Sequence, residues 1–191
     1  MSGETADLIM DVAHRLLAER GFSAFSYADI AEAIEIRKAS IHHHFPTKTT
    51  LVVAVLERHR LRMQEAFIGL EEHVPSPISR LKKYVDYWEV CIRNRTQPFC
   101  ISALLGAELP GLPEEVQIEV GKHFTCLRQW LAKTMKDGVK QKVIKLQQTP
   151  DIEAEMFMAA VHGAMLSARV NHSSTIFKQV TTATIQRIST R

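Results

Sequence analysis

Apolar residues recur at three- and four-residue intervals along most of this chain, and breaking residues interrupt them only at wide spacing. Glycine and proline are scarce, at 8 and 7 of 191 residues. No stretch alternates strictly for long enough to predict a strand. The pattern therefore predicts an all-α protein, with three short helices in front, a long connecting helix and about five more.

Local signals place the helix boundaries. Residues 5–20 form the first expected helix, with Gly21 as its C-cap. Ser26 is a good N-cap, and Asp29 follows it at the capping-box position. Pro46 is expected to end the third helix, and Thr47 to cap a fourth that runs to about residue 72. Further breaks between helices are expected at Pro75, Pro77, Pro98, Pro110–Pro113, Pro150 and Asn171–Ser174.

Composition and targeting signals favour a folded cytoplasmic protein. Hydrophobic residues make up 46% and charged residues 24%, as in folded soluble proteins. The nearest candidate for a membrane span, residues 156–168, is short and contains His162, so we expect a buried helix and no membrane partner. Acidic residues occupy the N-terminus where a signal peptide needs lysines. Three cysteines without a C-x-x-C pair predict reduced thiols.

The charge is unevenly distributed near the N-terminus. Residues 1–35 contain two basic and seven acidic residues, whereas residues 36–56 contain Arg37, Lys38 and Lys48 and no acidic residue. A short basic segment beside an acidic one predicts a local anion-binding surface, for which phosphate is an obvious partner.

The front helices have the layout of a helix-turn-helix motif, whose second short helix enters the DNA major groove. Here that helix is residues 37–45, with Ile41 and Phe45 on its inner face. Arg37 can form paired bonds with guanine, and Lys38 and Lys48 can neutralise phosphate. The outer faces carry Arg37, Lys38, Ser40, His42 and His43.

The segment FSYADIAEAIEIRKASIHHHFPTK, residues 25–48, resembles the TetR family of transcriptional regulators. The matching positions are Asp29, Ile30, Ala31, Lys38, Ser40, His43, Phe45 and Lys48, and the specific resemblance covers roughly residues 5–56. It implies a helix-turn-helix domain over residues 1–48 and an effector-binding and dimerisation domain over residues 49–191. The candidate DNA-binding residues are Ser26, Tyr27, Arg37, Lys38, Ala39, Ser40, His42, His43 and Lys48.

Four positions depart from the family pattern. Glu35 replaces the turn glycine, which predicts a strained backbone there. Arg37 stands where a serine or threonine often caps the recognition helix, so the cap is expected to be weaker. Ala39 replaces a glycine near the DNA, and His42 replaces a tyrosine that often faces the phosphates.

The run His42-His43-His44 raises the question of a metal site. Consecutive residues on a helix point about 100° apart, so the three imidazoles do not converge, and a helical pair needs i,i+4 spacing. We expect His42 and His43 to face DNA and His44 to pack or end the helix. No metal and no cofactor are predicted.

The C-terminal part is expected to dimerise and to bind an effector, as the resemblance implies. Small residues four apart permit close helix approach, although packing within one chain is an alternative. The expected dimer residues are Ala160, Gly163, Ala164, Ser167, Ile176, Phe177, Val180 and Thr184.

The middle helices of the family usually enclose a small-molecule pocket. Its candidate lining residues here are Trp88, Cys91, Cys100, Leu104, Phe124, Phe157, His162 and Met165, and an ordinary core role is the alternative for each. A thiol that senses an electrophile or oxidant is a further alternative at Cys91 or Cys100, but no nearby pattern of basic residues requires a lowered pKa.

Catalytic motifs such as G-x-S-x-G and H-E-x-x-H do not occur in the sequence, so an enzyme is not expected. The prediction is a homodimeric, ligand-responsive regulator, a repressor, that binds a palindromic DNA operator and an unknown small-molecule effector. The alternative is a helical dimeric adaptor without specific DNA binding. Such an adaptor would not need the acid-free segment from Arg37 to Lys48.

Overall fold

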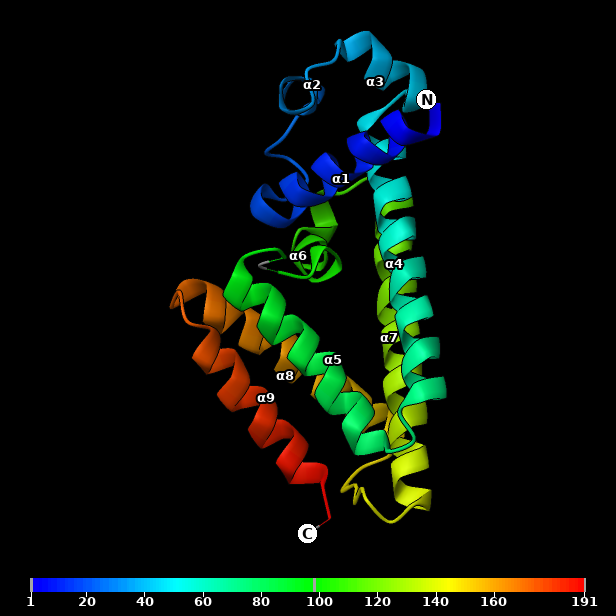
Figure 1. Ribbon diagram of the computed structural model, residues 1–191, viewed down its shortest axis with the longest axis vertical. Helices are drawn as coiled ribbons and strands as arrows, with labels where there is room; N and C mark the ends of the chain where they lie inside the picture. Colours follow the sequence, from blue (N-terminus) through cyan, green and yellow to red (C-terminus); the bar gives the residue numbers. More distant parts are fainter. Residues whose placement is uncertain (1, 98, 191) are drawn as a thin grey trace. The chain divides into compact units, whose positions relative to one another are not determined.

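The computed structural model describes residues 2–97 and 99–190, and it consists of helices joined by short connections (Figure 1). In this part of the chain the only extended pairing is an isolated bridge between Ile144 and Ser189. The helices are α1 Ser2–Arg20, α2 Tyr27–Ala33, α3 Lys38–His44, α4 Lys48–His73, α5 Pro77–Asn94, α6 Ile101–Ala107, α7 Glu114–Lys140, α8 Pro150–Val170 and α9 Ser174–Ile188, with a 3₁₀ turn η1 at Leu109–Gly111.

The all-α prediction is confirmed, and so are most of the expected helix ends. Gly21 ends α1 with a φ of 78°, a conformation that suits glycine. Among the described residues, five α-helices follow α4, as expected. The break predicted at Pro98 lies outside the described residues. The helix ends follow from local capping and turn residues, because each of these signals acts over only a few residues.

Two compact units make up the chain, and neither is continuous in sequence. The first consists of residues 1–61 and 100–123, and the second of residues 62–99 and 124–191. The domain boundary expected after residue 48 remains a prediction. The helices α4 and α7 each contribute residues to both units.

The first unit buries apolar side chains from several helices. Ile9 of α1, Ile30 of α2, Ile41 of α3 and Leu51 of α4 are all fully buried. Burial of such a side chain stabilises the fold by about 1.5–3 kcal/mol. On the surface of this unit, Arg58 of α4 forms ion pairs with Asp7 and Asp11 of α1.

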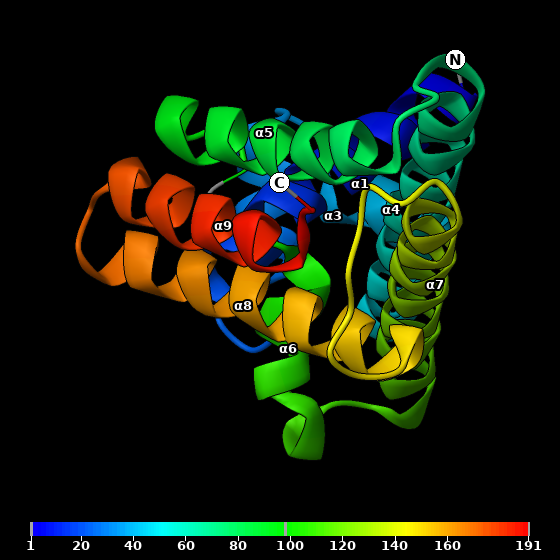
Figure 2. The ribbon, with the colours of Figure 1, turned by 90° about the horizontal axis from the view of Figure 1, so that it is seen from below.

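The second unit contains α5, α8 and α9, which lie side by side in both ribbon views (Figures 1 and 2). Phe157 of α8 and Phe177 of α9 are fully buried. The carboxylate of Glu153 is buried as well and accepts a hydrogen bond of 2.5 Å from Arg187. This bond holds the pKa of Glu153 below its usual value.

None of the described helices has both the length and the apolar character that crossing a membrane requires.

Candidate DNA-binding surface

The helix-turn-helix motif begins with a complete capping box at Ser26. The Ser26 hydroxyl accepts a hydrogen bond from the amide of Ala28 at 3.2 Å, and the Asp29 carboxylate accepts one from the amide of Ser26 at 2.7 Å. These bonds from Ser26 lower the pKa of Asp29. The predicted cap is thus confirmed, and Ser26 has a defined structural role at the start of α2.

Tyr27 fastens α2 to the end of α3. Its hydroxyl donates a hydrogen bond of 2.8 Å to the carbonyl oxygen of Phe45, and burial raises its pKa to about 12. The ring of His42 lies edge-on against the Tyr27 ring, with centroids 4.8 Å apart. Tyr27, one of the predicted DNA-binding residues, is buried and bonds α2 to the end of α3.

The turn between α2 and α3 carries the strain that the sequence predicts. Glu35 has a φ of 55°, in the left-handed region that costs an L-residue roughly 1–2 kcal/mol. The amide of the next residue, Ile36, donates to the carbonyl of Ala31 at 3.0 Å and closes the turn. Arg37 then occupies the N-cap of α3 without a side-chain capping bond, as predicted.

The outer side of α3 is an exposed, acid-free surface. Arg37, Lys38, Ala39, His42 and His43 are exposed, and Ser40 is half-buried. Within α3, Ile41 is the buried side chain, and the residues of the outer side remain accessible. We call this set of six residues the α3 surface.

The three histidines of α3 have different surroundings. His42 Nδ1 lies 3.2 Å from the carbonyl oxygen of Pro46, in addition to its contact with Tyr27. His43 and His44 lie edge-to-face, with ring centroids 5.5 Å apart. His42 and His43 are both exposed, and His42 also contacts Tyr27.

Lys48 has a different environment from the one its predicted role implies. Its ammonium donates a hydrogen bond to the carbonyl oxygen of Phe25 and lies over the rings of Phe22 and Phe25, at 4.8 and 4.0 Å from their centroids. Burial lowers its pKa. Lys48 thus ties the start of α4 to the α1–α2 connection, and part of its bonding capacity is used within the chain.

The predicted effector residues are divided between the two units. Trp88, Cys91, Phe157 and Met165 are buried in the second unit. In that unit Phe124 and His162 are in edge-to-face contact at 5.5 Å, and burial lowers the pKa of His162 to about 4. By contrast, Cys100 and Leu104 belong to the first unit.

The predicted dimer residues also separate into two groups. Gly163 and Val180 are exposed, and Ala160, Ser167, Ile176 and Thr184 are half-buried. Ala164 and Phe177 are buried within the single chain, so they belong to the packing of α8 on α9 rather than to an outer face. Periodicity placed all eight on helices but did not show which face the chain itself covers.

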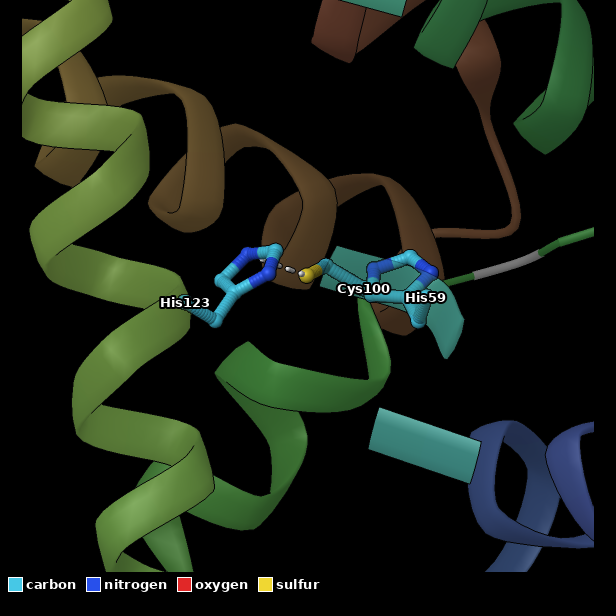
Figure 3. A group of neighbouring side chains, drawn as sticks. All are labelled: His59, Cys100 and His123. Atoms are coloured by element: carbon cyan, nitrogen blue, oxygen red, sulfur yellow. Dashed lines mark hydrogen bonds between the residues drawn. The ribbon is translucent and has the colours of Figure 1, made fainter. Parts of the chain in front are cut away.

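Sequence reasoning missed two groups of residues. Exposed apolar side chains continue the outer face of α8 at Met156, Leu166 and Val170, which helical spacing from Gly163 would have found. His59 of α4 and His123 of α7 meet Cys100 at the N-cap of α6 (Figure 3). No sequence spacing predicts this second group, because each residue comes from a different helix.

Two family models together match most of the chain. The model of the bacterial regulatory proteins of the tetR family matches residues 9–55, and that of the tetracyclin repressor-like C-terminal domain matches residues 77–184. The first covers the helix-turn-helix motif and the second covers more than half of the chain.

Individual proteins agree with these matches. A TetR family transcriptional regulator from Agrobacterium tumefaciens has a solved structure with 41% identity and a TM-score of 0.97, over 100% of both chains. The HTH-type transcriptional repressor DhaR of Mycobacterium sp. (strain GP1) is 25% identical over 91% of this chain and 87% of its own length. The repressor NemR of Escherichia coli (strain K12) is 24% identical over 89% of this chain and 86% of its own. Since a family model matches more than half of the chain and a full-length relative shares its fold and 41% of its residues, the chain belongs to the TetR family of transcriptional regulators.

Proposed function

We propose that this regulator is a repressor that binds a palindromic operator as a homodimer and leaves it when a small effector binds. The observation that carries the proposal is the α3 surface, because it is exposed and acid-free on a unit whose first helices are acidic. Two copies would place two such helices in successive major grooves.

The chemistry of the α3 surface suits base and phosphate contacts. Arg37 precedes the first turn of α3, where side chains of a recognition helix reach base edges. Its fork of donors matches the O6 and N7 atoms of guanine, whereas Lys38 is suited to phosphate. His43 adds an exposed ring donor six residues later in the sequence. We propose that Lys48 has a mainly structural role, because its ammonium donates a hydrogen bond to the carbonyl oxygen of Phe25.

Dimerisation through α8 and α9 is supported by an exposed apolar face. Met156, Leu166 and Val170 of α8 are 45%, 55% and 69% exposed, and Val180 of α9 is 38% exposed. Gly163 lies between them in the middle of α8, and a Cβ built there would meet no atom of the described chain beyond its own helix within 4 Å. A second copy that packs against this face would bury both the apolar side chains and the glycine.

The sign of regulation is supported by the relatives, since DhaR and NemR are both repressors. Effector release is supported by the match of the C-terminal domain to the tetracyclin repressor-like model. The buried aromatic and sulfur-containing side chains of the second unit are suited to an apolar small molecule.

Selection of random duplex DNA by the purified protein tests the proposal. We expect an enriched inverted repeat whose half-sites lie about one helical turn apart, and a binding stoichiometry of two chains per duplex. Arg37→Ala should relax the selection at one base position, whereas Lys145→Ala, which removes an exposed charge from the second unit, should leave it unchanged. Weak, salt-sensitive binding to every duplex without enrichment would favour the helical adaptor instead.

A further inference from the structure

His59, Cys100 and His123 form a compact group inside the first unit (Figure 3). The Sγ atom of Cys100 lies 3.7 Å from Nε2 of His123, and one ligand-capable atom of each residue lies within 4.8 Å of the others. The two imidazole rings are nearly parallel, with centroids 5.2 Å apart. Cys100 is 1% and His123 2% exposed, and His59 is half-buried.

These distances approach those of a metal site. Zinc binds thiolate at about 2.3 Å and imidazole at about 2.0–2.1 Å, so tetrahedral angles place sulfur and nitrogen about 3.6 Å apart. The Cys100–His123 pair is already at nearly this spacing. Bringing the ligand atom of His59 to a similar distance requires a movement of at most about 1.5 Å.

The ligand types select the class of ion. A thiolate and two imidazoles suit Zn²⁺ and the other ions that prefer sulfur and nitrogen, whereas Mg²⁺ and Ca²⁺ require oxygen ligands. We propose that His59, Cys100 and His123 bind a transition-metal ion of the Zn²⁺ class. Three protein ligands leave a fourth position for water or for a further ligand.

Two salt bridges support the helices that carry the group. Arg60, next to His59 on α4, pairs with the buried carboxylate of Glu119 on α7 at 3.4 Å. Glu119 also pairs with Lys122, the residue before His123, at 2.5 Å. Glu119 lies one turn before His123, and the Arg60–Glu119 pair joins α4 to α7 beside the ligands, which helps to preorganise the site.

The position of the group gives the metal a regulatory role, which rests on the proposed function. All three ligands belong to the unit that contains the helix-turn-helix motif. The His59 ring also touches the ring of His14 on α1, with centroids 5.5 Å apart. A metal that draws His59 toward Cys100 therefore changes a contact of α1, the helix that supports the DNA-binding helices, and shifts operator affinity.

Cobalt titration of the reduced, metal-free protein tests the site. Co²⁺ is the probe because its bond to a thiolate gives a charge-transfer band in the near ultraviolet, which histidine ligands alone do not produce. We expect one Co²⁺ per chain, displacement by one equivalent of Zn²⁺ and none by Mg²⁺. Loss of an outer-shell partner alone weakens metal affinity by about 10- to 100-fold, so Cys100→Ser, His59→Gln and His123→Gln should each weaken Zn²⁺ binding by about 100-fold or more.

Matched controls separate this site from other thiols and histidines. Cys126→Ser removes a half-buried thiol of the second unit, and His43→Asn removes an exposed histidine of α3; both should keep the band and the affinity. Circular dichroism checks that each variant is folded. The site is refuted if the folded wild-type protein gives no thiolate band, or if the band survives in folded Cys100→Ser.

The regulatory role has its own test, a comparison of operator affinity with Zn²⁺ and with a chelator. A change of at least tenfold in wild type, absent from Cys100→Ser, is expected. Equal affinity in both conditions would refute metal regulation while the metal site stands. If neither the metal-free nor the Zn²⁺-loaded protein selects an operator, the proposed function is refuted. The cobalt result is unaffected by that outcome.

Discussion

The carboxylate of Glu108 accepts a hydrogen bond of 3.0 Å from the backbone amide of Phe22, 86 residues earlier in the chain. Gly21 allows this contact, because a Cβ built at Gly21 would overlap the Glu108 carboxylate. The C-cap residue of α6 is therefore bonded to the connection between α1 and α2, within the first unit. A displacement of α6 would act directly on the segment that leads into the DNA-binding helices.

We predict that Glu108→Ala destabilises the protein by about 1–3 kcal/mol, since the half-buried Phe22 amide loses its acceptor. Glu108→Gln keeps an acceptor oxygen and should lose much less. Urea unfolding measures both, with Glu65→Ala as a control that removes an exposed carboxylate. Equal stability of Glu108→Ala and Glu65→Ala would mean that the bond contributes nothing.

Glu35→Gly should stabilise the protein by up to about 1 kcal/mol, because glycine relieves the left-handed strain at φ 55°. Glu35→Ala keeps the strain and should leave stability nearly unchanged. Thermal unfolding of both variants distinguishes strain from charge. A gain in Glu35→Ala equal to that in Glu35→Gly would assign the effect to the carboxylate instead.

Arg37→Ser should change stability and DNA affinity in opposite directions. A serine at the N-cap supplies the missing capping bond of α3, worth about 0.5–2 kcal/mol of stability. Loss of the guanidinium should weaken operator binding by about 1–3 kcal/mol and relax specificity at one base position. Unfolding and operator titration are measured on the same sample, with Lys145→Ala as the charge control. Unchanged affinity would exclude Arg37 from base recognition.

Gly163→Leu should abolish or weaken the dimer without unfolding the chain. A Cβ built at Gly163 meets no atom of the described chain beyond its own helix, so we expect the leucine to clash only with an approaching partner. Gly121→Leu is the matched control, since Gly121 is also exposed in the middle of a long helix with open space around it. Light scattering gives the mass of each. A dimeric Gly163→Leu protein would move the interface elsewhere.

Stability should fall on acidification because of His162. Burial lowers its pKa in the folded state from 6.5 to about 4. Between these values the unfolded chain takes up a proton that the folded chain refuses, so stability is complete above pH 6.5 and declines as the pH falls toward 4. The loss should reach up to about 3 kcal/mol.

His162→Phe retains a ring against Phe124 and should remove this part of the pH dependence. Urea unfolding at several pH values between 4 and 7 measures the slope. His73→Gln, which changes an exposed histidine, should keep the wild-type slope. A His162→Phe protein with the wild-type slope would place the acid sensitivity at another group.

Much of the architecture was readable from the sequence because its signals are local. The capping box of Ser26 and Asp29, the C-cap at Gly21 and the strain at Glu35 each depend on residues within a few positions of one another. The absence of acidic residues from positions 36–56 is a property of the composition alone. Hydrogen bonds within a helix connect neighbours, so the helices and the α3 surface follow from short segments.

Only the tertiary structure decided which helix faces meet. Periodicity assigns a side chain to a face but does not identify the neighbour that covers it, and so Phe177 and Ala164 proved to be covered by their own chain. The ammonium of Lys48 donates a hydrogen bond to Phe25, and Cys100 lies beside His59 and His123, which belong to two other helices. Contacts between distant segments depend on how all the helices pack at once, and no local spacing in the sequence encodes that arrangement.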